Sequence, residues 1–344
     1  MNSAWSDATV RRTAWHRRSC SIAPVLVATA GVALLPLSSA QAHCFIGDFF
    51  LPATLTIDDP CVADELSLPT LTWAKSGAGS PTTQLDLSAD ISKRITENFG
   101  ITVGTDWSRI NSPGGLPMKG FQNLETNLQY QILKDAADEL AISGEVNVDW
   151  GGTGAKKLDT DPFSTIGASV QFGKGMGSLF DTTGWVRPLA LTGQIGYSVA
   201  TSSSTRSIDT DTRLLVSTRN PDFLTYGATL QYNMSYLKSS VVDLGLPTFV
   251  NHLIPLVEAQ FATPAANNAG AGIKTTGTIN PGIIWIGTYS QVSLETILPI
   301  NHDSGRGAGF MVQLHLYLDD IFPHTLGQPL FGPSASTTKS IYGN

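Results

Sequence analysis

Carboxylates recur at alternate positions along several stretches of the chain, and they are its most frequent candidates for chemistry. In one such stretch Asp86 and Asp90 alternate with Leu85 and Leu87. Alternate side chains of a β-strand lie on the same face, so these charged residues share the face opposite the apolar one. We expect the following residues to line this polar face: Asp86, Asp90, Arg94, Asp106, Glu125, Glu145, Asp149, Glu258 and Glu295.

The chemistry of this face depends on whether it encloses water. If the polar faces of several strands enclose a water-filled lumen, their carboxylates lower the energy of cations inside it and disfavour anions. Arg94 is the clearest basic counterpart. This interpretation predicts a cation-leaning pathway for small solutes. A second interpretation is that the carboxylates accept hydrogen bonds from neighbouring Ser, Thr and Asn side chains and fill a narrow interior.

A hydrolytic alternative comes from the sequence N-H-D-S-G-R at 301–306. His302 and Ser304 have the parity of Leu298, which would place both on the outer side of a strand. The stretch resembles one in outer-membrane phospholipase A, a twelve-stranded barrel whose His and Ser act on its outer wall. That resemblance implies that His302 is the base and Ser304 the nucleophile. Since no orienting Asn is obvious on the adjoining strand, a solvated loop is the favoured interpretation.

His315 is a weaker candidate for a metal ligand. It falls on the polar face, but no second His or Cys stands near it in the sequence. We therefore expect His315 to form hydrogen bonds in the lumen, and we expect no metal and no cofactor.

Two cysteines follow the first 42 residues, at positions 44 and 61. In an oxidising compartment we expect Cys44 and Cys61 to pair, a bond worth about 3 kcal/mol in the chain-entropy model; two free thiols are the alternative. The surrounding segment, residues 43–64, does not alternate and contains Pro52 and Pro60. It predicts a disulfide-stapled segment before the barrel, either a cap in the periplasm or a plug in the lumen.

The first 42 residues have the features of a secretory signal peptide. An apolar run at 23–37 follows a basic region, and a small-x-small cleavage site occupies 40–42. The basic region contains Arg11, Arg12, Arg17 and Arg18. We predict Sec export and cleavage before His43.

Charge and hydropathy exclude several classes of protein. The formal charge of the whole chain is −7, and it becomes about −10 after cleavage because the leader removes four arginines and one aspartate. Such a chain is not expected to bind nucleic acid. Charged residues make up 14%, below the roughly 25% typical of soluble domains. After the leader no apolar run approaches the roughly 20 residues of a spanning helix, so a membrane would be crossed by strands.

Alternation recurs often enough to predict an all-β fold, a transmembrane antiparallel up-and-down β-barrel of about twelve strands. The expected domain limits are a signal peptide at 1–42, the stapled segment at 43–64, the barrel at 65–318 and a periplasmic, partly disordered tail at 319–344. The expected strands are Glu65–Lys75, Gln84–Ser92, Ile101–Trp107, Leu124–Ile132, Leu140–Trp150, Ile166–Phe172, Leu189–Val199, Tyr226–Tyr236, Leu253–Phe261, Thr276–Ile286, Val292–Leu298 and Gly309–Leu318.

The last expected strand, 309–318, should pair back onto 70–75 and close the barrel. Its opening glycine and regularly spaced apolar residues resemble the signal by which closing strands are recognised for assembly. Aromatic residues near strand ends predict two interfacial girdles. The outer girdle would contain Trp73, Trp107, Trp150, Phe163, Tyr226 and Phe310, and the inner one Phe172 and Tyr236. A soluble β-sandwich explains less well why so many strands keep one face almost free of charge.

Two segments resemble a known family. Phe49–Thr70 and Leu316–Gly332 are similar to bacterial outer-membrane proteins grouped as meta-pathway phenol-degradation transporters. The resemblance implies an exported barrel in the outer membrane that passes or accepts small, often hydrophobic or aromatic, compounds. The expected partners are outer-membrane lipid, a small-molecule solute and the barrel-assembly machinery. The alternatives are the lipid hydrolase and a structural or adhesin-like barrel whose long loop at 201–221 meets a partner.

Overall fold

The computed structural model describes residues 44–332 except 77–81, 180–183, 209–213 and 268–273. The predicted signal peptide at 1–42 and the last twelve residues of the chain lie outside the described residues. Among the helices of the described segments, none has the length and apolar character needed to cross a bilayer.

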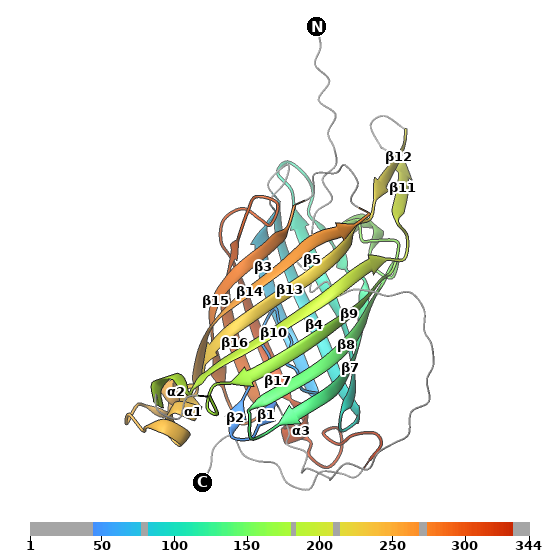
Figure 1. The fold of residues 1–344 in the computed structure, drawn as a ribbon. Helices are drawn as coiled ribbons and strands as arrows, with labels where there is room; N and C mark the ends of the chain where they lie inside the picture. Colours follow the sequence, from blue (N-terminus) through green and yellow to red (C-terminus); the bar gives the residue numbers. More distant parts are fainter. Residues whose placement is uncertain (1–43, 77–81, 180–183, 209–213, 268–273, 333–344) are drawn as a thin grey trace.

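The chain forms a closed antiparallel β-barrel of twelve strands (Figure 1). Neighbours in sequence pair around the wall, and the ring closes because β3 pairs with both β4 and β17. The strands of the wall are β3 (Glu65–Lys75), β4 (Thr83–Thr96), β5 (Phe99–Asn111), β7 (Leu124–Asp135), β8 (Leu140–Trp150), β9 (Thr165–Gly175), β10 (Leu189–Ala200), β13 (Asp222–Tyr232), β14 (Leu253–Ala266), β15 (Thr276–Ile286), β16 (Ser290–Pro299) and β17 (Gly309–Tyr317). We call the barrel end where β3 begins and β17 ends the base, and the opposite end the rim.

The closing pair is the one that the sequence predicts. Phe310 of β17 lies opposite Trp73 of β3, and their rings stack with centroids 5.7 Å apart. On the other parity, Met311 and Gln313 are buried and face the lumen. One face of β17 therefore belongs to the outer wall of the barrel, and the other face lines the lumen.

Pro69 is accommodated by a bulge in β3. Ser67 pairs with Asp90 and Thr70 pairs with Ser88, so β3 advances three residues while β4 advances two. Proline has no N–H for the ladder, and a bulge removes the need for one. Because the bulge shifts the alternation by one residue, Ser67 and Thr70 both face inward.

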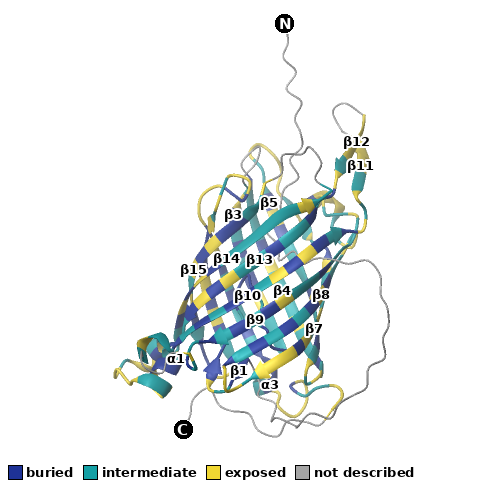
Figure 2. Ribbon diagram, viewed as in Figure 1, coloured by how far each residue is buried: buried dark blue, intermediate teal, exposed yellow. Residues whose placement is uncertain are grey.

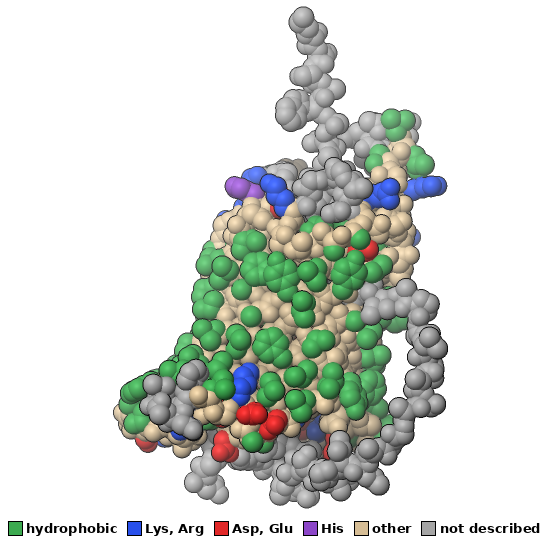
Figure 3. All heavy atoms as spheres, viewed as in Figure 1, with side chains coloured by type: hydrophobic (Ala, Val, Ile, Leu, Met, Phe, Trp, Pro, Cys, Tyr) green, Lys and Arg blue, Asp and Glu red, His purple; other side chains and the backbone are tan. Residues whose placement is uncertain are grey.

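The outer wall is apolar and the inner face is polar. Figure 3 shows hydrophobic side chains covering the middle of the visible wall, with basic groups at the rim and acidic groups near the base. Exposed and buried residues alternate along the strands (Figure 2). Exposed apolar side chains of the wall include Leu87, Ile91, Val103, Leu128, Val146, Val170, Ile195, Leu230, Val257, Ile283, Val292 and Leu294.

Strand β13 ends earlier than predicted, which corrects the assignment of Tyr236 to the inner aromatic girdle. The strand stops at Tyr232, and Asn233 caps the short helix α1 (Met234–Tyr236) by accepting a hydrogen bond from the Tyr236 N–H. Asparagine favours such a cap because its side chain satisfies an unpaired backbone donor. Tyr236 is buried and its ring packs against Phe49, 4.7 Å away, so it does not face lipid.

The connections contain short elements of their own. The long loop predicted at 201–221 contains a hairpin that projects beyond the rim. The connection that follows β13 at the base forms a helical segment that projects sideways from the barrel. These elements are β6 (Met118–Phe121), η1 (Lys156–Leu158), η2 (Gly184–Val186), β11 (Ser204–Ile208), β12 (Leu215–Arg219), η3 (Leu237–Val241), α2 (Thr248–Asn251) and α3 (Leu318–Ile321).

Residues 44–64, which we call the N-terminal segment, lie inside the barrel. They begin with a small hairpin of β1 (Phe45–Ile46) and β2 (Phe49–Phe50) near the base (Figure 1). Their apolar side chains pack on the inner wall: Phe50 clusters with Ile254 and Tyr317, and Leu55 clusters with Ile297 and Met311. The structure thus resolves the choice between cap and plug in favour of a plug.

Candidate functional site: the acidic lumen

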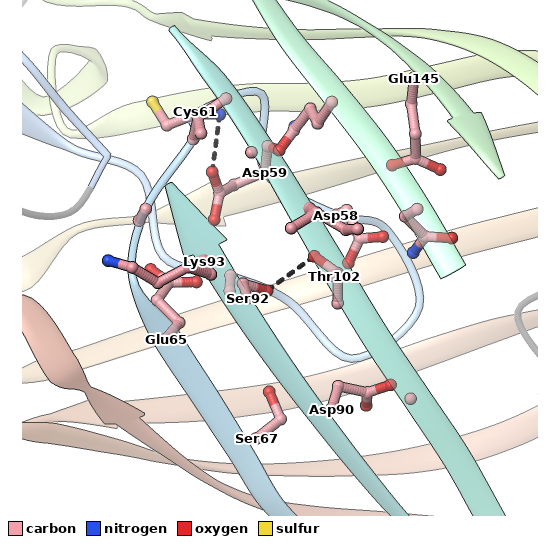
Figure 4. A pocket seen from close by; sticks show the side chains of 18 of the residues that line it. Asp58, Asp59, Cys61, Glu65, Ser67, Asp90, Ser92, Lys93, Thr102 and Glu145 are labelled. Atoms are coloured by element: carbon pink, nitrogen blue, oxygen red, sulfur yellow. Dashed lines mark hydrogen bonds between the residues drawn. The ribbon is translucent and has the colours of Figure 1, made fainter. Parts of the chain in front are cut away.

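Two adjoining cavities lie between the N-terminal segment and the wall. The basal cavity is bordered by Glu65, Ser67 and Ser92 near the base, and Figure 4 shows it from close by. The rim-side cavity is bordered by Thr70, Thr72, Ser88 and others further along the same strands. Asp90 and Glu125 border both cavities, so the two spaces meet at this pair of carboxylates.

Four of the predicted lining residues border these cavities. Asp90 and Glu125 are common to both, Asp106 belongs to the rim-side cavity and Glu145 to the basal cavity. They come from four consecutive wall strands, β4, β5, β7 and β8, whose polar parity faces inward. The lumen between this wall and the N-terminal segment is therefore strongly acidic.

The N-terminal segment adds acids that periodicity could not reveal. Asp58 and Asp59 border the basal cavity together with Glu65, the first residue of β3 (Figure 4). Burial raises the pKa of Asp59 well above its ordinary value, and the nearby charges of Glu65 and Asp58 raise it further. The Cys61 N–H, which donates to the Asp59 carboxylate at 2.8 Å, and the charge of Lys134 oppose this increase.

Glu258 holds the N-terminal segment to the opposite wall. Its carboxylate accepts hydrogen bonds from the Thr56 N–H at 3.0 Å, the Thr56 hydroxyl at 2.6 Å and the Thr229 hydroxyl at 3.0 Å. Glu258 is fully buried. It therefore faces the lumen as predicted by parity, but its role is to anchor the segment.

Glutamine side chains from other strands bind the same segment through its backbone. Gln129 donates to the Asp59 carbonyl at 2.9 Å, Gln291 to the Ala53 carbonyl at 2.6 Å and Gln260 to the Thr56 carbonyl at 3.2 Å. These residues belong to β7, β16 and β14. The segment is thus bonded to distant parts of the wall and crosses the lumen.

The predicted disulfide is confirmed: Cys44 and Cys61 are bonded. The bond joins the start of the N-terminal segment to its later part. Both cysteines belong to a buried apolar cluster that includes Phe49 and Leu51. Cys44, Cys61 and Asp59 are close enough to share a metal ion, but both sulfurs are used in the disulfide and cannot act as thiolate ligands.

Arg94 does not border either cavity, contrary to the expectation that it is the basic counterpart of the lumen lining. Its guanidinium is buried at the base, 2.9 Å from Asp64 and 3.6 Å from Asp319, and it donates to the Gly327 carbonyl at 2.6 Å. A register irregularity between Arg94 and Thr96 marks this end of β4. The residue therefore joins the start and the end of the barrel.

Lys93 borders the basal cavity, although it has the parity of the outward-facing Leu87 and Ile91. Its ammonium group lies 2.7 Å from Asp64 and donates to the carbonyls of Leu326 and Gln328. A long side chain near a strand end can bend around the edge of the sheet, which parity does not describe. The described part of the tail is consequently bonded to the base.

The remaining predicted acids, Asp86, Asp149 and Glu295, border neither of the two cavities. Asp86 is buried and accepts hydrogen bonds from Ser108 and Gln84. Asp149 accepts from Asn123 at 2.9 Å, near the rim. Glu295 is fully buried on β16, opposite Gly282.

His315 lies with Nδ1 2.9 Å from the Ser67 hydroxyl and Nε2 3.2 Å from Glu65.

The hydrolase candidate has a different geometry from the one predicted. His302 and Ser304 lie in a turn between β16 and β17, so strand parity does not apply to them. Ser304 is buried; its hydroxyl donates to the Asn301 side chain at 2.8 Å and accepts from the Gly277 N–H at 2.9 Å. Within the described segments no hydrogen bond joins His302 to Ser304. The serine shapes the turn and is not oriented as a nucleophile towards a base.

No family model matches the chain, and no curated protein matches its sequence. Solved structures with a similar fold include the NanC porin, which is 10% identical with a TM-score of 0.40 over 73% of this chain and 98% of that one. The outer membrane channel from Pseudomonas putida F1 is 11% identical, with a TM-score of 0.48 over 74% and 94% of the two chains. The translocator domain of the autotransporter NalP from Neisseria meningitidis is 9% identical, with a TM-score of 0.44 over 76% and 89%.

The chain folds as a β-barrel of the outer-membrane type. Its own strand pairing and its two-faced wall carry that assignment.

Proposed function

We propose that this protein is an outer-membrane channel through which small solutes, cations more readily than anions, cross between the rim and the base. The apolar outer wall supports a position in the bilayer, where exposed Leu, Ile and Val side chains contact lipid. The described ends of the barrel chain both lie at the base, which we assign to the periplasmic side.

The observation that carries the proposal is the continuity of acidic side chains along the lumen. Asp106 borders the rim-side cavity, Asp90 and Glu125 border both cavities, and Glu145 and Asp58 border the basal one. A narrow polar path surrounded by low-dielectric walls concentrates this charge and lowers the energy of a cation within it. The same field raises the energy of an anion.

The N-terminal segment limits the size of what passes. Since residues 44–64 cross the lumen and bond to several strands, a solute has only the space beside the segment. Part of that space is apolar, because Leu55, Ile297 and Met311 border the rim-side cavity. This lining supports solutes with a hydrophobic or aromatic portion, the class implied by the resemblance to phenol-degradation transporters.

Reversal potentials in planar bilayers test the proposal. With purified protein in a KCl gradient, we expect a potential that indicates K⁺ over Cl⁻ preference. Replacing Asp90 and Glu125 with Asn and Gln should shift the potential towards zero, because these carboxylates sit where the two cavities meet. Asp243→Asn, in an exposed connection at the base, is a control that should leave the potential unchanged. Anion preference would overturn the selectivity, and the absence of conductance both with the native disulfide and after its reduction would overturn the channel.

A further inference from the structure

The rim-side cavity has two chemically different polar walls. Asp90, Asp106 and Glu125 form one of them, from strands β4, β5 and β7. Across the lumen, Asn280 and Thr278 of β15 form the other and contribute neutral polar groups. A molecule in this space would meet negative charge on one side and amide and hydroxyl groups on the other.

Asn280 gives independent evidence for a ligand. Its side chain is fully buried, and neither its amide nitrogen nor its carbonyl oxygen has a hydrogen-bond partner in the part of the chain that the structure describes. Buried amides are normally satisfied, so one with both groups unused and bordering a cavity indicates that another molecule supplies the partners.

Gln313 repeats this feature where the basal cavity begins. It is buried, its amide nitrogen donates to the Thr70 hydroxyl at 2.9 Å, and its carbonyl oxygen has no partner within the described segments. Gln313 borders the basal cavity and Thr70 the rim-side cavity. Its carbonyl oxygen adds a hydrogen-bond acceptor close to the junction of the two spaces.

An apolar surface completes the rim-side cavity. Leu55 of the N-terminal segment, Ile297 and Met311 border it and pack together with Ala74 as a buried cluster. Such a surface contributes nothing to an inorganic cation, which prefers a shell of oxygen ligands. It favours a solute that carries a hydrocarbon portion.

We propose that the rim-side cavity is a binding site for small organic ammonium ions. The ammonium N–H groups donate to the carboxylates of Asp90 and Glu125, and the hydrocarbon portion lies on Leu55, Ile297 and Met311. Asn280 on the facing wall binds water that accompanies the ammonium group. The inference deepens the proposed function, since it places a preferred solute class within the same pathway. Binding, however, can be measured whether or not the protein conducts.

Isothermal titration calorimetry on the purified full chain in detergent tests the site, with hexylammonium chloride as the probe. Hexanol keeps the hydrocarbon without the charge, hexanoate reverses the charge, and KCl supplies a cation without hydrocarbon. We expect saturable binding of hexylammonium alone. Asp90→Asn with Glu125→Gln should weaken it by roughly tenfold or more, because charge-assisted hydrogen bonds are lost. Asn280→Ala should weaken it less, and Asp243→Asn should not change it.

Heat-modifiable gel mobility shows for each variant that the barrel is folded. Equal binding of hexanol or potassium, or unchanged binding in the Asp90/Glu125 variant, would overturn the site. The bilayer recordings separate this failure from that of the channel. Cation-selective conductance without hexylammonium binding rejects the site alone, whereas hexylammonium binding without conductance rejects the channel alone.

Discussion

The carboxylate of Glu258 receives both the backbone N–H and the hydroxyl of Thr56, at 3.0 and 2.6 Å, across 202 positions of sequence. One partner belongs to strand β14 and the other to the N-terminal segment inside the lumen. Both are buried, so the Thr56 N–H and hydroxyl depend on this carboxylate for their hydrogen bonds. This contact fixes the middle of the segment to β14, across the lumen from the acidic strands β4, β5 and β7.

Glu258→Ala should loosen the N-terminal segment. The substitution leaves the buried Thr56 N–H without its acceptor, which costs about 1–3 kcal/mol of docking free energy. Hydrogen exchange at amides 53–58 should accelerate accordingly. Thr229→Val is the matched control, since it removes a hydrogen bond to the same carboxylate without touching the segment. Unchanged exchange in Glu258→Ala would show that the contact does not anchor the segment.

Loss of the disulfide should affect the N-terminal segment and spare the barrel. In the double variant Cys44→Ser/Cys61→Ser, the chain-entropy model predicts a loss of about 3 kcal/mol from docking of the segment. Proteolysis within 44–61 should increase, while heat-modifiable mobility stays the same because the strand ladder does not depend on the bond. Reduction of the native protein should reproduce the effect. A variant that fails to form the barrel would contradict this separation.

Docking of the N-terminal segment should weaken as pH rises. Burial and the charges of Glu65 and Asp58 raise the pKa of Asp59, so its neutral form is favoured when the segment is docked. The contribution of neutral Asp59 to docking of the segment is complete below the ordinary pKa of 3.8. It is lost as the pH rises through the raised pKa of the docked state. Protection factors at amides 58–62, corrected for intrinsic exchange, should fall as the pH rises above the ordinary pKa of 3.8. Asp59→Asn should flatten this dependence, and a steeper fall in that variant would refute it.

Arg94→Gln should be strongly destabilising. The guanidinium pairs with buried Asp64, and removing one partner of a buried ion pair typically costs about 3–5 kcal/mol. The substitution also breaks the hydrogen bond to the Gly327 carbonyl, so protease sites in 318–332 should become accessible. Lys93→Met, which removes a more exposed partner of the same carboxylate, should cost less. Equal unfolding midpoints for Arg94→Gln and the native barrel would refute the network.

The stacked pair of Trp73 and Phe310 should stabilise barrel closure. A double-mutant cycle with Trp73→Ala and Phe310→Ala should give a coupling energy of about 0.5–1.5 kcal/mol, as aromatic pairs do beyond their buried area. Urea unfolding from lipid vesicles measures it. As a control, Trp150→Ala combined with Phe310→Ala should show no coupling, because Trp150 lies on β8, away from the closing pair. Additive effects of Trp73 and Phe310 would show that stacking does not contribute.

Most of the wall was predictable because the information is local. Alternation with a period of two assigns each strand and its lumen-facing side, and Leu85 with Asp86 or Val312 with Gln313 show it over neighbouring positions. The first expected strand, Glu65–Lys75, has the same bounds in the structure. The prediction was wrong at Tyr236, because α1 begins where local capping by Asn233 replaces the strand ladder. It was also wrong for Arg94, whose partners Asp64 and Asp319 come from opposite ends of the barrel chain.

The sequence by itself determined a two-faced wall, an acidic interior and a pair of cysteines suited to a disulfide, because all three follow from residue type and spacing. Only the tertiary structure decided what fills the interior. The N-terminal segment has no periodicity, so its position depends on contacts such as Thr56 with Glu258, and those form only when the barrel brings distant strands around it. Closure of the barrel also decides which carboxylates border a cavity and which are used up in hydrogen bonds or ion pairs that hold the structure together. Residues from other strands supply those partners, so parity along one strand cannot predict them.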